Sequence, residues 1–332
     1  MKRATLKDIA SLTGLSISGV SKALNEHPDI GQKTREKVKE VARSLNYYPN
    51  PSAQLLRMRS SKIIAVILPE VNTFFFPEVL QGISKVVEQN GYSLLFLQSD
   101  NSLLKERGLA EYCLQMFVDG VLISLTSETS DVKHLEILQK NGPIVCMIDR
   151  GLQNDQIPLL TIDDHETAFQ AVDYLVKKGH TKILGIFDDS RLAMTKLRAE
   201  GFQAAHVANQ IDLDEGQMVM LDKDTEIEHR ITELLDQYPG ATAIFTMSDK
   251  LMIKACHVLA CLGLKIPEDM ALIAISDGKA PHYHFPAITH MKHSGEEVGQ
   301  TAARLLIEKL EGKKAKIEFV KIQAPLIELG SV

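Results

Sequence analysis

The chain has 332 residues, of which 45% are hydrophobic and 24% are charged, and its formal net charge is −6. This length and composition predict a globular protein of about two or three domains with a large core. No apolar run reaches the roughly 18 residues that a membrane span needs, and no apolar segment follows the N-terminal charges as in a secretory signal. We therefore expect a cytoplasmic protein that has no membrane partner.

The charge is unevenly distributed along the chain. Residues 1–62 contain 12 Lys/Arg and 5 Asp/Glu, whereas the other 270 residues contain 25 and 38. A basic segment on an acidic body is typical of a protein that presents one end to a polyanion, although lysines can also cluster by chance on a helical surface. The cysteines are scattered in apolar surroundings, which predicts reduced core residues and no disulfide framework: Cys113, Cys146, Cys256 and Cys261.

The stretch Thr5–Asn25 predicts a short helix, a turn and a second helix. Thr5 with Asp8 resembles a capping box, Gly14 can end the first helix, and Ser16 is placed to cap the second. In the second helix the small apolar residues pack inward, which leaves a polar face of Ile17, Ser18, Ser21, Lys22 and Asn25. Such a face suits the major groove of DNA, but a small helical bundle with an ordinary polar surface fits the pattern as well.

A third helix is predicted over Lys33–Asn46, after the turn at residues 26–29. Pro51 then allows a short helix over Ser52–Arg59, which has apolar residues and two arginines but little to bury them locally. This segment is either a plain linker or a hinge that folds only when DNA and a second copy of the chain cover it.

From Lys62 onward, apolar strands alternate with helical stretches, which predicts an α/β domain with parallel sheets. The number of units exceeds one ordinary doubly wound sheet and favours two similar lobes, with ligands bound beyond the carboxyl ends of the strands. The predicted strands are residues 63–68, 93–97, 120–124, 144–148, 159–162, 183–187, 217–221, 243–246, 272–275 and 288–291. The predicted helices are residues 76–90, 103–116, 132–141, 166–178, 192–208, 227–237, 250–262 and 295–310.

Several runs together resemble the lac-repressor (LacI/GalR) family of bacterial transcription regulators. They include TLKDIA at residues 5–10, GVSKALN at 19–25, LNYYPN at 45–50, VDGVLI at 118–123, LVKKGH at 175–180 and LRAEGF at 197–202. The resemblance implies an α-helical helix-turn-helix headpiece (residues 1–48), a hinge helix (49–61) and an α/β two-lobed effector domain like periplasmic sugar-binding proteins (62–332). It places the N-lobe at about residues 62–161 and 292–321, and the C-lobe at about 162–291 and 322–332.

The resemblance also implies which residues meet DNA. Ile17, Ser18, Lys22 and Asn25 match groove-reading positions, Leu56 matches a leucine wedged into a central base step, and Ala53 packs beside it. The remaining expected contacts come from side chains placed for phosphates or at a helix start: Thr5, Ser16, Ser21 and Thr34.

Three residues depart from the family pattern in the headpiece. Gly19 stands where Thr is frequent, Lys22 replaces the more frequent Arg, and Gly31 stands where a Ser cap is usual. Lysine lacks the planar fork of arginine, so the base discrimination at this position differs from that of arginine-bearing relatives. We nevertheless expect a homodimer that binds a pseudo-palindromic site in double-stranded operator DNA.

The expected effector site gathers residues at strand ends. Arg198 in LRAEGF matches an arginine that holds effector oxygens, and Phe75 or Phe76 could stack on a ring, although at least one neighbouring phenylalanine is ordinary core. Arg150 can equally well form a structural pair with a nearby acid. The other candidates are Asn72, Ser99, Asp149, Arg191, Asp249, Ser276 and Asp277.

The strand near residue 275 also departs from the family. Ser276 stands where the family usually has an aspartate, so the carboxylate that commonly binds vicinal hydroxyls is missing or displaced to Asp277. A neutral pyranose bound in the usual way is therefore in doubt. A phosphorylated or acidic sugar stays open because of the arginines, as does a receptor that barely needs a ligand.

No pattern in the sequence predicts catalysis, a cofactor or a metal. The histidines at positions 282, 284, 290 and 293 lie close together but have no recognised metal spacing, and no HExxH, GxGxxG or GxSxG run is present. The leading hypothesis is a repressor of a carbohydrate-related operon, controlled by a sugar or sugar derivative between the lobes. The alternatives are a solute-binding protein without a transcriptional role, which the missing signal disfavours, and a sugar-modifying enzyme.

Overall fold

The computed structural model describes residues 4–47, 60–72, 74–222, 226–313 and 319–332. The chain divides into two compact units, Met1–Ser61 and Lys62–Val332, and each is described here by itself. The hinge helix predicted over residues 52–59, with Ala53 and Leu56, lies outside the described residues.

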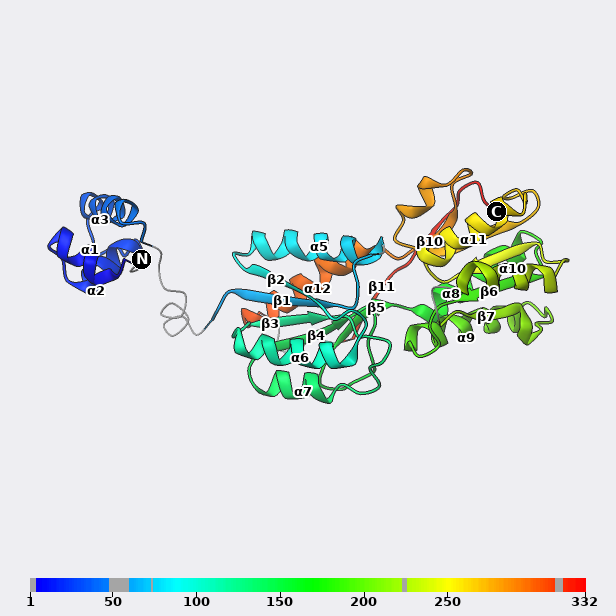
Figure 1. Ribbon diagram of the computed structural model, residues 1–332, viewed down its shortest axis with the longest axis horizontal. Helices are drawn as coiled ribbons and strands as arrows, with labels where there is room; N and C mark the ends of the chain where they lie inside the picture. Colours follow the sequence, from blue (N-terminus) through cyan, green and yellow to red (C-terminus); the bar gives the residue numbers. More distant parts are fainter. Residues whose placement is uncertain (1–3, 48–59, 73, 223–225, 314–318) are drawn as a thin grey trace. The chain divides into compact units, whose positions relative to one another are not determined.

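The first unit is a bundle of three helices: α1 (Leu6–Thr13), α2 (Ile17–Leu24) and α3 (Gln32–Ser44) (Figure 1). The Thr5 hydroxyl and the Asp8 carboxylate cap α1 reciprocally, as the sequence predicts. Gly14 then ends α1 with a φ of 73°, a backbone conformation that costs glycine little, and the Ser16 side chain caps α2. These signals fix a sharp turn between two helices of eight residues each.

The bundle has a small core in which each helix contributes one or two fully buried side chains. The core residues are Ile9, Val20, Ala23, Val38 and Ala42. Because so little apolar surface is buried, the bundle is expected to be only marginally stable by itself.

The second unit begins with a six-stranded parallel sheet in the order β11-β5-β4-β3-β1-β2. Helices α5 and α12 pack together on one face, and α6 and α7 lie on the other (Figure 1). The strands are β1 (Ile63–Leu68), β2 (Ser93–Gln98), β3 (Gly120–Ile123), β4 (Ile144–Ile148), β5 (Leu159–Ile162) and β11 (Val320–Ile322). The helices are α5 (Phe75–Gln89), α6 (Leu103–Gln115), α7 (Lys133–Lys140) and α12 (Gly295–Leu310).

A second six-stranded sheet follows in the order β12-β10-β9-β8-β6-β7, in which β12 is antiparallel to β10. Helices α8 and α9 pack against each other, as do α10 and α11. The strands are β6 (Ile183–Phe187), β7 (Met218–Met220), β8 (Ala243–Thr246), β9 (Ala271–Ser276), β10 (Thr289–Lys292) and β12 (Leu326–Ile327). The helices are α8 (Asp164–Lys177), α9 (Ala193–Ala208), α10 (Ile227–Gln237), α11 (Asp249–Cys261) and the short 3₁₀ turns η1 (Glu215–Gln217) and η3 (Ala280–Tyr283).

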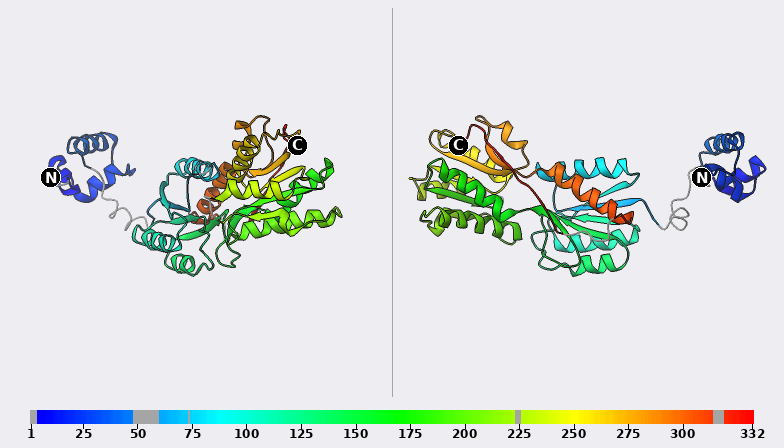
Figure 2. Two further views of the ribbon diagram at one scale, coloured as in Figure 1. Left: turned by 45° about the vertical axis from the view of Figure 1, so that its right-hand side comes forward. Right: turned by 180° about the vertical axis from the view of Figure 1, so that it is seen from behind.

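The two sheets form two lobes, which we call the N-lobe (the β1 sheet) and the C-lobe (the β6 sheet). Within the described ranges the chain passes between them after β5, after β10 and after β11 (Figure 2). The predicted two-lobed α/β architecture is therefore confirmed. None of the described helices combines the length and the apolar composition that a bilayer span requires.

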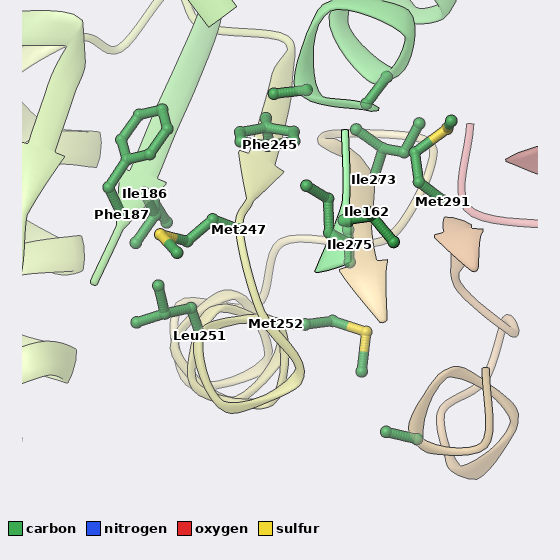
Figure 3. Close-up of a cluster of buried hydrophobic side chains, with 14 of the residues drawn as sticks. Ile162, Ile186, Phe187, Phe245, Met247, Leu251, Met252, Ile273, Ile275 and Met291 are labelled. Atoms are coloured by element: carbon green, nitrogen blue, oxygen red, sulfur yellow. The ribbon is translucent and has the colours of Figure 1, made fainter. Parts of the chain in front are cut away.

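The C-lobe core leads directly to the edge of the sheet where ligands are expected. Phe187 packs against Phe202 and Phe245, with ring centroids 5.6 and 5.7 Å away. Met247, which follows β8, and Ile275, near the end of β9, extend this cluster (Figure 3). The same two side chains also line a cavity between the lobes.

Small residues bring α5 and α12 close together in the N-lobe. A Cβ atom added to Gly299 would lie 2.1 Å from the backbone oxygen of Val79, and one added to Gly82 would lie 2.3 Å from that of Glu296. Only glycine fits at these crossing points, since real Cβ atoms are never found so close to a backbone atom. This close contact positions the start of α5, where Phe75 and Phe76 lie.

Candidate functional site

The exposed face of α2 carries most of the predicted DNA contacts. Ile17, Ser18, Lys22 and Asn25 are exposed, and the Ile17 side chain stands 50% exposed although it is apolar. The Ser16 hydroxyl accepts a hydrogen bond from the Gly19 amide at 3.0 Å, so it also holds the start of the helix. The α2 surface therefore combines hydroxyl groups, a cation, an amide and an apolar side chain, which can all contact base edges or phosphates.

Two polar groups on this face are engaged in the described structure. Lys22 Nζ lies 3.1 Å from Asp29 Oδ2, and Asn25 Nδ2 donates to the Ser21 carbonyl at 2.6 Å. Lys22 lowers the pKa of the Asp29 carboxyl through a hydrogen bond and through its charge. Both members of the ion pair are about half exposed, so water and salt screen the attraction strongly.

The other expected headpiece contacts lie on neighbouring turns. Thr5 is exposed at the start of α1, and Ser21 and Thr34 are half-buried in α2 and α3. A Cβ added to Gly19 would lie 3.2 Å from the Ser16 hydroxyl, and Gly31 starts α3 without a side-chain cap. Gly31 therefore leaves the start of α3 without the cap that a Ser could give, whereas a side chain at position 19 would have to fit closely against Ser16, which caps α2.

A cavity of about 90 Å³ lies between the two lobes at the carboxyl ends of their strands. Its walls come from both lobes and contain carboxylates, cations and apolar side chains. The lining residues are Glu70, Phe75, Phe76, Asp149, Arg150, Asp188, Leu192, Met194, Arg198, Met247, Ser248, Asp249, Lys250, Ile275, Ser276, Asp277 and His293. We call this space the interlobe cavity.

Two phenylalanines at the start of α5 form the aromatic wall of the interlobe cavity. The ring of half-buried Phe75 lies 4.4 Å from the His293 ring, between centroids. Phe76 is buried and its ring lies 5.3 Å from the Arg150 guanidinium. Phe74 points elsewhere, because its ring is 40% exposed and lies near Tyr283.

The three cations of the cavity are already paired with carboxylates. Arg150 Nη2 lies 3.1 Å from Glu70 Oε1, and Lys250 Nζ lies 3.0 Å from Asp188 Oδ1. Arg198 is 2% exposed, and its Nε donates to Asp164 Oδ1 at 2.8 Å.

The paired cations mainly stabilise the wall of the cavity by linking its elements. Arg198 also donates from Nη1 to the Met247 carbonyl at 2.6 Å, so it ties α8 to the end of β8. Burying such a pair costs desolvation free energy that good geometry offsets, and losing one member leaves a buried charge unpaired.

The carboxylates Asp249 and Asp277 form a buried network at the ends of β8 and β9. Asp249 accepts hydrogen bonds from the Ser276 hydroxyl and from the Asp277 amide, the latter at 3.0 Å. Asp277 Oδ1 accepts from the Lys279 and Ala280 amides at 2.7 and 3.2 Å. Burial, and then the charge of Asp277, raise the pKa of Asp249 to about 7.

Two further titratable groups face the cavity from the N-lobe side. Burial raises the pKa of Asp149 to about 6, although Arg198 and Arg150 oppose the shift. Burial also lowers the pKa of His293 well below its ordinary value, so this imidazole is neutral at pH 7. Asp149 Oδ1 and His293 Nε2 are 3.7 Å apart.

Four polar atoms around the cavity are buried and form no hydrogen bond within the described parts of the chain. They are Asp149 Oδ1, Asp277 Oδ2, Arg198 Nη2 and His293 Nε2, of which Arg198 Nη2 retains its ion pair with Asp164. Buried polar groups are nearly always hydrogen-bonded in native proteins. Four such atoms around one cavity indicate a binding site for a polar ligand.

The structure brings most of the predicted effector residues to this cavity. Asp277 is among them and lies one residue after Ser276, which also lines the cavity. The predicted residues in the lining are Phe75, Phe76, Asp149, Arg150, Arg198, Asp249, Ser276 and Asp277.

Three predicted effector residues lie outside the lining. Ser99 is fully buried and its hydroxyl donates to the Leu68 carbonyl at 3.4 Å, so it supports β1. Arg191 turns back to Asp189, with Nη2 2.6 Å from Oδ2. Asn72 follows β1 but does not contribute to the wall. These residues satisfy the strand-end pattern, but none of them lines the cavity.

Several residues that line the cavity were not predicted from the sequence. Leu192, Met194 and Met247 give it an apolar side, which no polar motif indicates. His293 stood out in the sequence only as a candidate metal ligand, although its place after the predicted strand 288–291 could have indicated the cavity. No group of three or more potential metal ligands occurs among the residues that the structure describes.

Known families match both units of the chain. The family described as bacterial regulatory proteins, lacI family, matches residues 5–50. The family described as periplasmic binding proteins and sugar binding domain of LacI family matches residues 61–329.

Curated relatives match over nearly the full length. The transcriptional regulator MalR of Clostridium butyricum is 28% identical over 91% of this chain and 91% of its own length. The repressor CytR of Escherichia coli is 28% identical over 99% of this chain and 96% of its own, and the repressor PurR of Vibrio vulnificus is 28% identical over 99% and 98%.

Solved structures share the fold. The Lac repressor bound to ONPG in its repressed state matches with a TM-score of 0.86 and 22% identity, over the whole of both chains. The regulator CelR in complex with cellobiose matches with a TM-score of 0.74 and 24% identity, over 99% of this chain and all of the other.

Proposed function

We propose a mechanism for this chain from the premise that it belongs to the LacI family of bacterial regulatory proteins and is a sequence-specific DNA-binding transcriptional regulator. In the proposed mechanism, α2 reads one half of a pseudo-palindromic operator, and two copies of the chain occupy the two halves. A small sugar-related ligand in the interlobe cavity then controls repression of a carbohydrate-related operon.

The observation that carries the ligand part is the set of unsatisfied buried atoms between the lobes. Asp149 belongs to the N-lobe, Asp277 belongs to the C-lobe, and His293 follows the strand at which the chain returns to the N-lobe. A ligand that bonds to all three favours the arrangement in which the lobes hold these atoms close together. Its effect on the regulator equals its difference in affinity for the two arrangements of the lobes.

Two observations support a sugar as the proposed ligand: the family that the chain matches and the side chains that line the cavity. The matched family includes sugar-binding domains, and the similar regulator CelR was solved as a complex with cellobiose. Carboxylates, a guanidinium and an aromatic wall provide the acceptors, donors and stacking surface that a polyhydroxylated ring needs. A cavity of about 90 Å³ suits a small ligand, because pockets for drug-sized molecules have roughly 300–1,000 Å³.

A homodimer is supported by exposed apolar side chains that span both lobes. Phe285 is 95% exposed and Tyr283 is 80% exposed in the C-lobe. The Tyr283 ring lies 6.2 Å from the ring of Phe74, which precedes α5 of the N-lobe. Exposed aromatic side chains of this kind are typical of protein interfaces.

The DNA-binding part is tested by selecting fragments from random DNA with the purified full chain, followed by gel shifts. We expect a two-fold symmetric site whose affinity falls by about 10³-fold or more between about 50 and 200 mM salt. The absence of any two-fold symmetric site would contradict the proposed operator. A solute-binding protein without a transcriptional role would select no DNA at all.

The role of α2 is tested with Lys22→Ala. Loss of a cation at a base edge or phosphate should weaken operator binding by about tenfold or more. The matched control is Lys85→Ala, since Lys85 is an exposed lysine on α5 outside the headpiece. If both variants lost operator affinity equally, net charge alone would determine the affinity. That result would contradict the proposal that α2 reads the operator.

A further inference from the structure

The interlobe cavity contains more carboxylates than its own cations can pair with. Glu70, Asp164 and Asp188 pair with Arg150, Arg198 and Lys250, as described above. Asp149, Asp249 and Asp277 form no ion pair with a lysine or arginine among the described residues. His293 does not change this balance, because it is neutral at pH 7.

These three carboxylates are also removed from water. Asp149 is 5% exposed, Asp249 is 7% exposed and Asp277 is 6% exposed. Burying an ionised carboxylate without a partner is costly, and the group either takes up a proton or acquires a cation. Burial shifts two of these groups towards protonation, because it raises the pKa of Asp149 to about 6 and that of Asp249 to about 7.

The two unsatisfied oxygens in the cavity are both carboxylate oxygens, Asp149 Oδ1 and Asp277 Oδ2. Ionised carboxylates accept hydrogen bonds and do not donate them. Their missing partner on a ligand is therefore a donor, and a positively charged donor forms the stronger bond. The ring of Phe75 lies in the same wall, and aromatic faces also attract cations.

The same geometry disfavours an anionic ligand. Arg150 and Arg198 are the guanidinium groups of the wall, and each is already bonded to a carboxylate. A phosphate or carboxylate ligand would have to displace Glu70 or Asp164, or bind close to unpaired negative charges. Arg191, a third arginine considered for such a role, lies outside the lining and is held by Asp189.

We propose that the effector of this regulator is a sugar derivative that carries a protonated amine, such as an amino sugar, which binds the carboxylates of Asp277 and Asp149 through its ammonium group and its hydroxyl groups. The proposal rests on the proposed function, because it names the chemical class of the ligand for the same cavity. The charge of the wall disfavours sugar phosphates and sugar acids.

The first experiment measures binding of matched ligands to the full chain by calorimetry at about pH 7.5. The probes are glucosamine, galactosamine and mannosamine, each with its parent hexose, its N-acetyl form and its 6-phosphate. We expect at least one amino sugar to bind about tenfold or more tightly than its parent and its N-acetyl form, with no binding of the phosphates.

The second experiment removes the negative charge of Asp277 but keeps the hydrogen bonds that this side chain accepts within the protein. In Asp277→Asn the side-chain oxygen can still accept from the Lys279 and Ala280 amides, while the unsatisfied Oδ2 becomes an uncharged NH₂ group. We expect the affinity for the amino sugar to fall by about tenfold or more, and that for the parent hexose to change by less than about threefold. The matched control is Asp236→Asn, because Asp236 is exposed on α10, away from the cavity.

The pH dependence supplies an independent readout. The amino sugar should bind more weakly as pH falls from about 7.5 to 5.5, because protonation of Asp249 and Asp149 then removes negative charge from the cavity wall. The other charged or titratable groups that face these carboxylates are Glu70 and Arg150 from the N-lobe, Asp164 from α8, Asp188 after β6, Arg198 from α9, Lys250 from α11, Asp277 after β9 and His293 after β10.

The possible outcomes separate this proposal from the proposed function. Tighter binding of a parent hexose, an N-acetyl form or a phosphate would overturn the ammonium proposal while leaving a sugar-controlled regulator intact. Binding of no probe would overturn it too, and gel shifts with the selected operator would then still test the DNA-binding function separately. An equal loss of affinity in Asp277→Asn and Asp236→Asn would reject the assigned carboxylate.

Discussion

The Lys22 ammonium group has two potential partners that compete for it, the Asp29 carboxylate and DNA. In the described structure it pairs with Asp29, which follows α2 in the turn before α3. In the proposed complex, phosphates and guanine acceptors of DNA compete for the same ammonium group, so binding would first release it from Asp29. The pair is about half exposed, which makes the release cheap.

Asp29→Asn is therefore expected to strengthen DNA binding. The variant removes the competitor of Lys22 and one negative charge beside the reading helix, so affinity for the selected operator should rise by about two- to fivefold at about 50 mM salt. The gain should shrink as salt increases. Gel-shift titrations at several salt concentrations provide the measurement, and Asp131→Asn, an exposed carboxylate in the effector domain, is the control. A weaker complex with Asp29→Asn would show that Asp29 positions Lys22 for its contact.

Asp249 gives the folding stability of the effector domain an unusual dependence on pH. Its pKa in the folded protein is about 7, well above the ordinary value of 3.8, chiefly because it is buried. Between these values the folded state binds more protons than the unfolded state does. The contribution of Asp249 to stability is thus fully present below about pH 4 and is lost as pH rises towards about 7.

Asp249→Asn should remove this dependence and stabilise the protein at neutral to basic pH. The asparagine can accept from the Asp277 amide and donate to the Ser276 hydroxyl oxygen, so both neighbours keep a partner. We expect the unfolding temperature at about pH 8 to rise by about 2–4 °C, which corresponds to about 1 kcal/mol for a domain of this size. Thermal unfolding of both proteins from about pH 5 to 8 checks this, and parallel curves would contradict the assignment.

Residue identities predicted only part of the interlobe cavity. Strand ends located Asp149, Arg150 and Asp277 correctly, because the carboxyl ends of parallel strands meet at one edge of a sheet. The sequence does not specify which way a loop side chain turns. Ser99 therefore lies inside the fold, bonded to the Leu68 carbonyl, and Arg191 pairs with an aspartate only two positions earlier. The hydrogen bond between Arg198 and Asp164 joins α9 to α8, and local sequence patterns do not predict a contact between residues so far apart in the chain.

At the scale of elements, the packing of α5 against α12 depends on the absence of side chains. Gly82, Gly295 and Gly299 each bring one helix to the backbone of the other. Because α5 also begins with Phe75 and Phe76, this contact fixes the aromatic wall of the interlobe cavity relative to the sheet. A change at the helix crossing should therefore affect the cavity at a distance.

Gly299→Ala should destabilise the effector domain by about 1–3 kcal/mol, since the new methyl group would overlap the Val79 carbonyl and force the helices apart. Its matched control is Gly108→Ala on α6, where an added Cβ meets nothing within 4 Å. That control should be neutral or stabilising by up to about 1 kcal/mol, because alanine favours a helix. Urea unfolding of the two variants measures the difference, and similar midpoints would refute the overlap.

Most elements could be predicted because their hydrophobic patterns are long and regular. The predicted strands 63–68 and 144–148 have the bounds of β1 and β4, since both are continuous apolar runs buried in a parallel sheet. The missed strands β11 and β12 have three and two residues, too few for any periodicity to show. They are held by pairing with β5 and β10, which the local sequence does not encode.

On the scale of the whole molecule, the exposed aromatic patch of Phe74, Tyr283 and Phe285 matters because a symmetric operator needs two headpieces. Phe285→Glu should convert a dimer into a monomer at micromolar concentration, by burying a charge in the proposed interface. Operator affinity should fall by about tenfold or more in the same variant.

Sedimentation of the full chain measures the oligomeric state of Phe285→Glu. Leu104→Glu is the control, because Leu104 is also apolar and 82% exposed but lies on α6. A dimer that survives Phe285→Glu and dissociates in Leu104→Glu would move the interface to the opposite face of the N-lobe.

An ion pair outside the cavity also joins the lobes: Lys279 Nζ, after β9, lies 2.6 Å from Glu78 Oε1 on α5. The Lys279 side chain is 55% exposed, so water and salt screen this pair, and it gives only a small bias towards the arrangement of the lobes in this structure. That bias acts before any effector arrives, and it weakens when salt screens the charges. The midpoint of the regulator's dose–response curve is thus set partly by surface charge, and changes in ionic strength should shift the background level of transcription while every ligand contact stays the same.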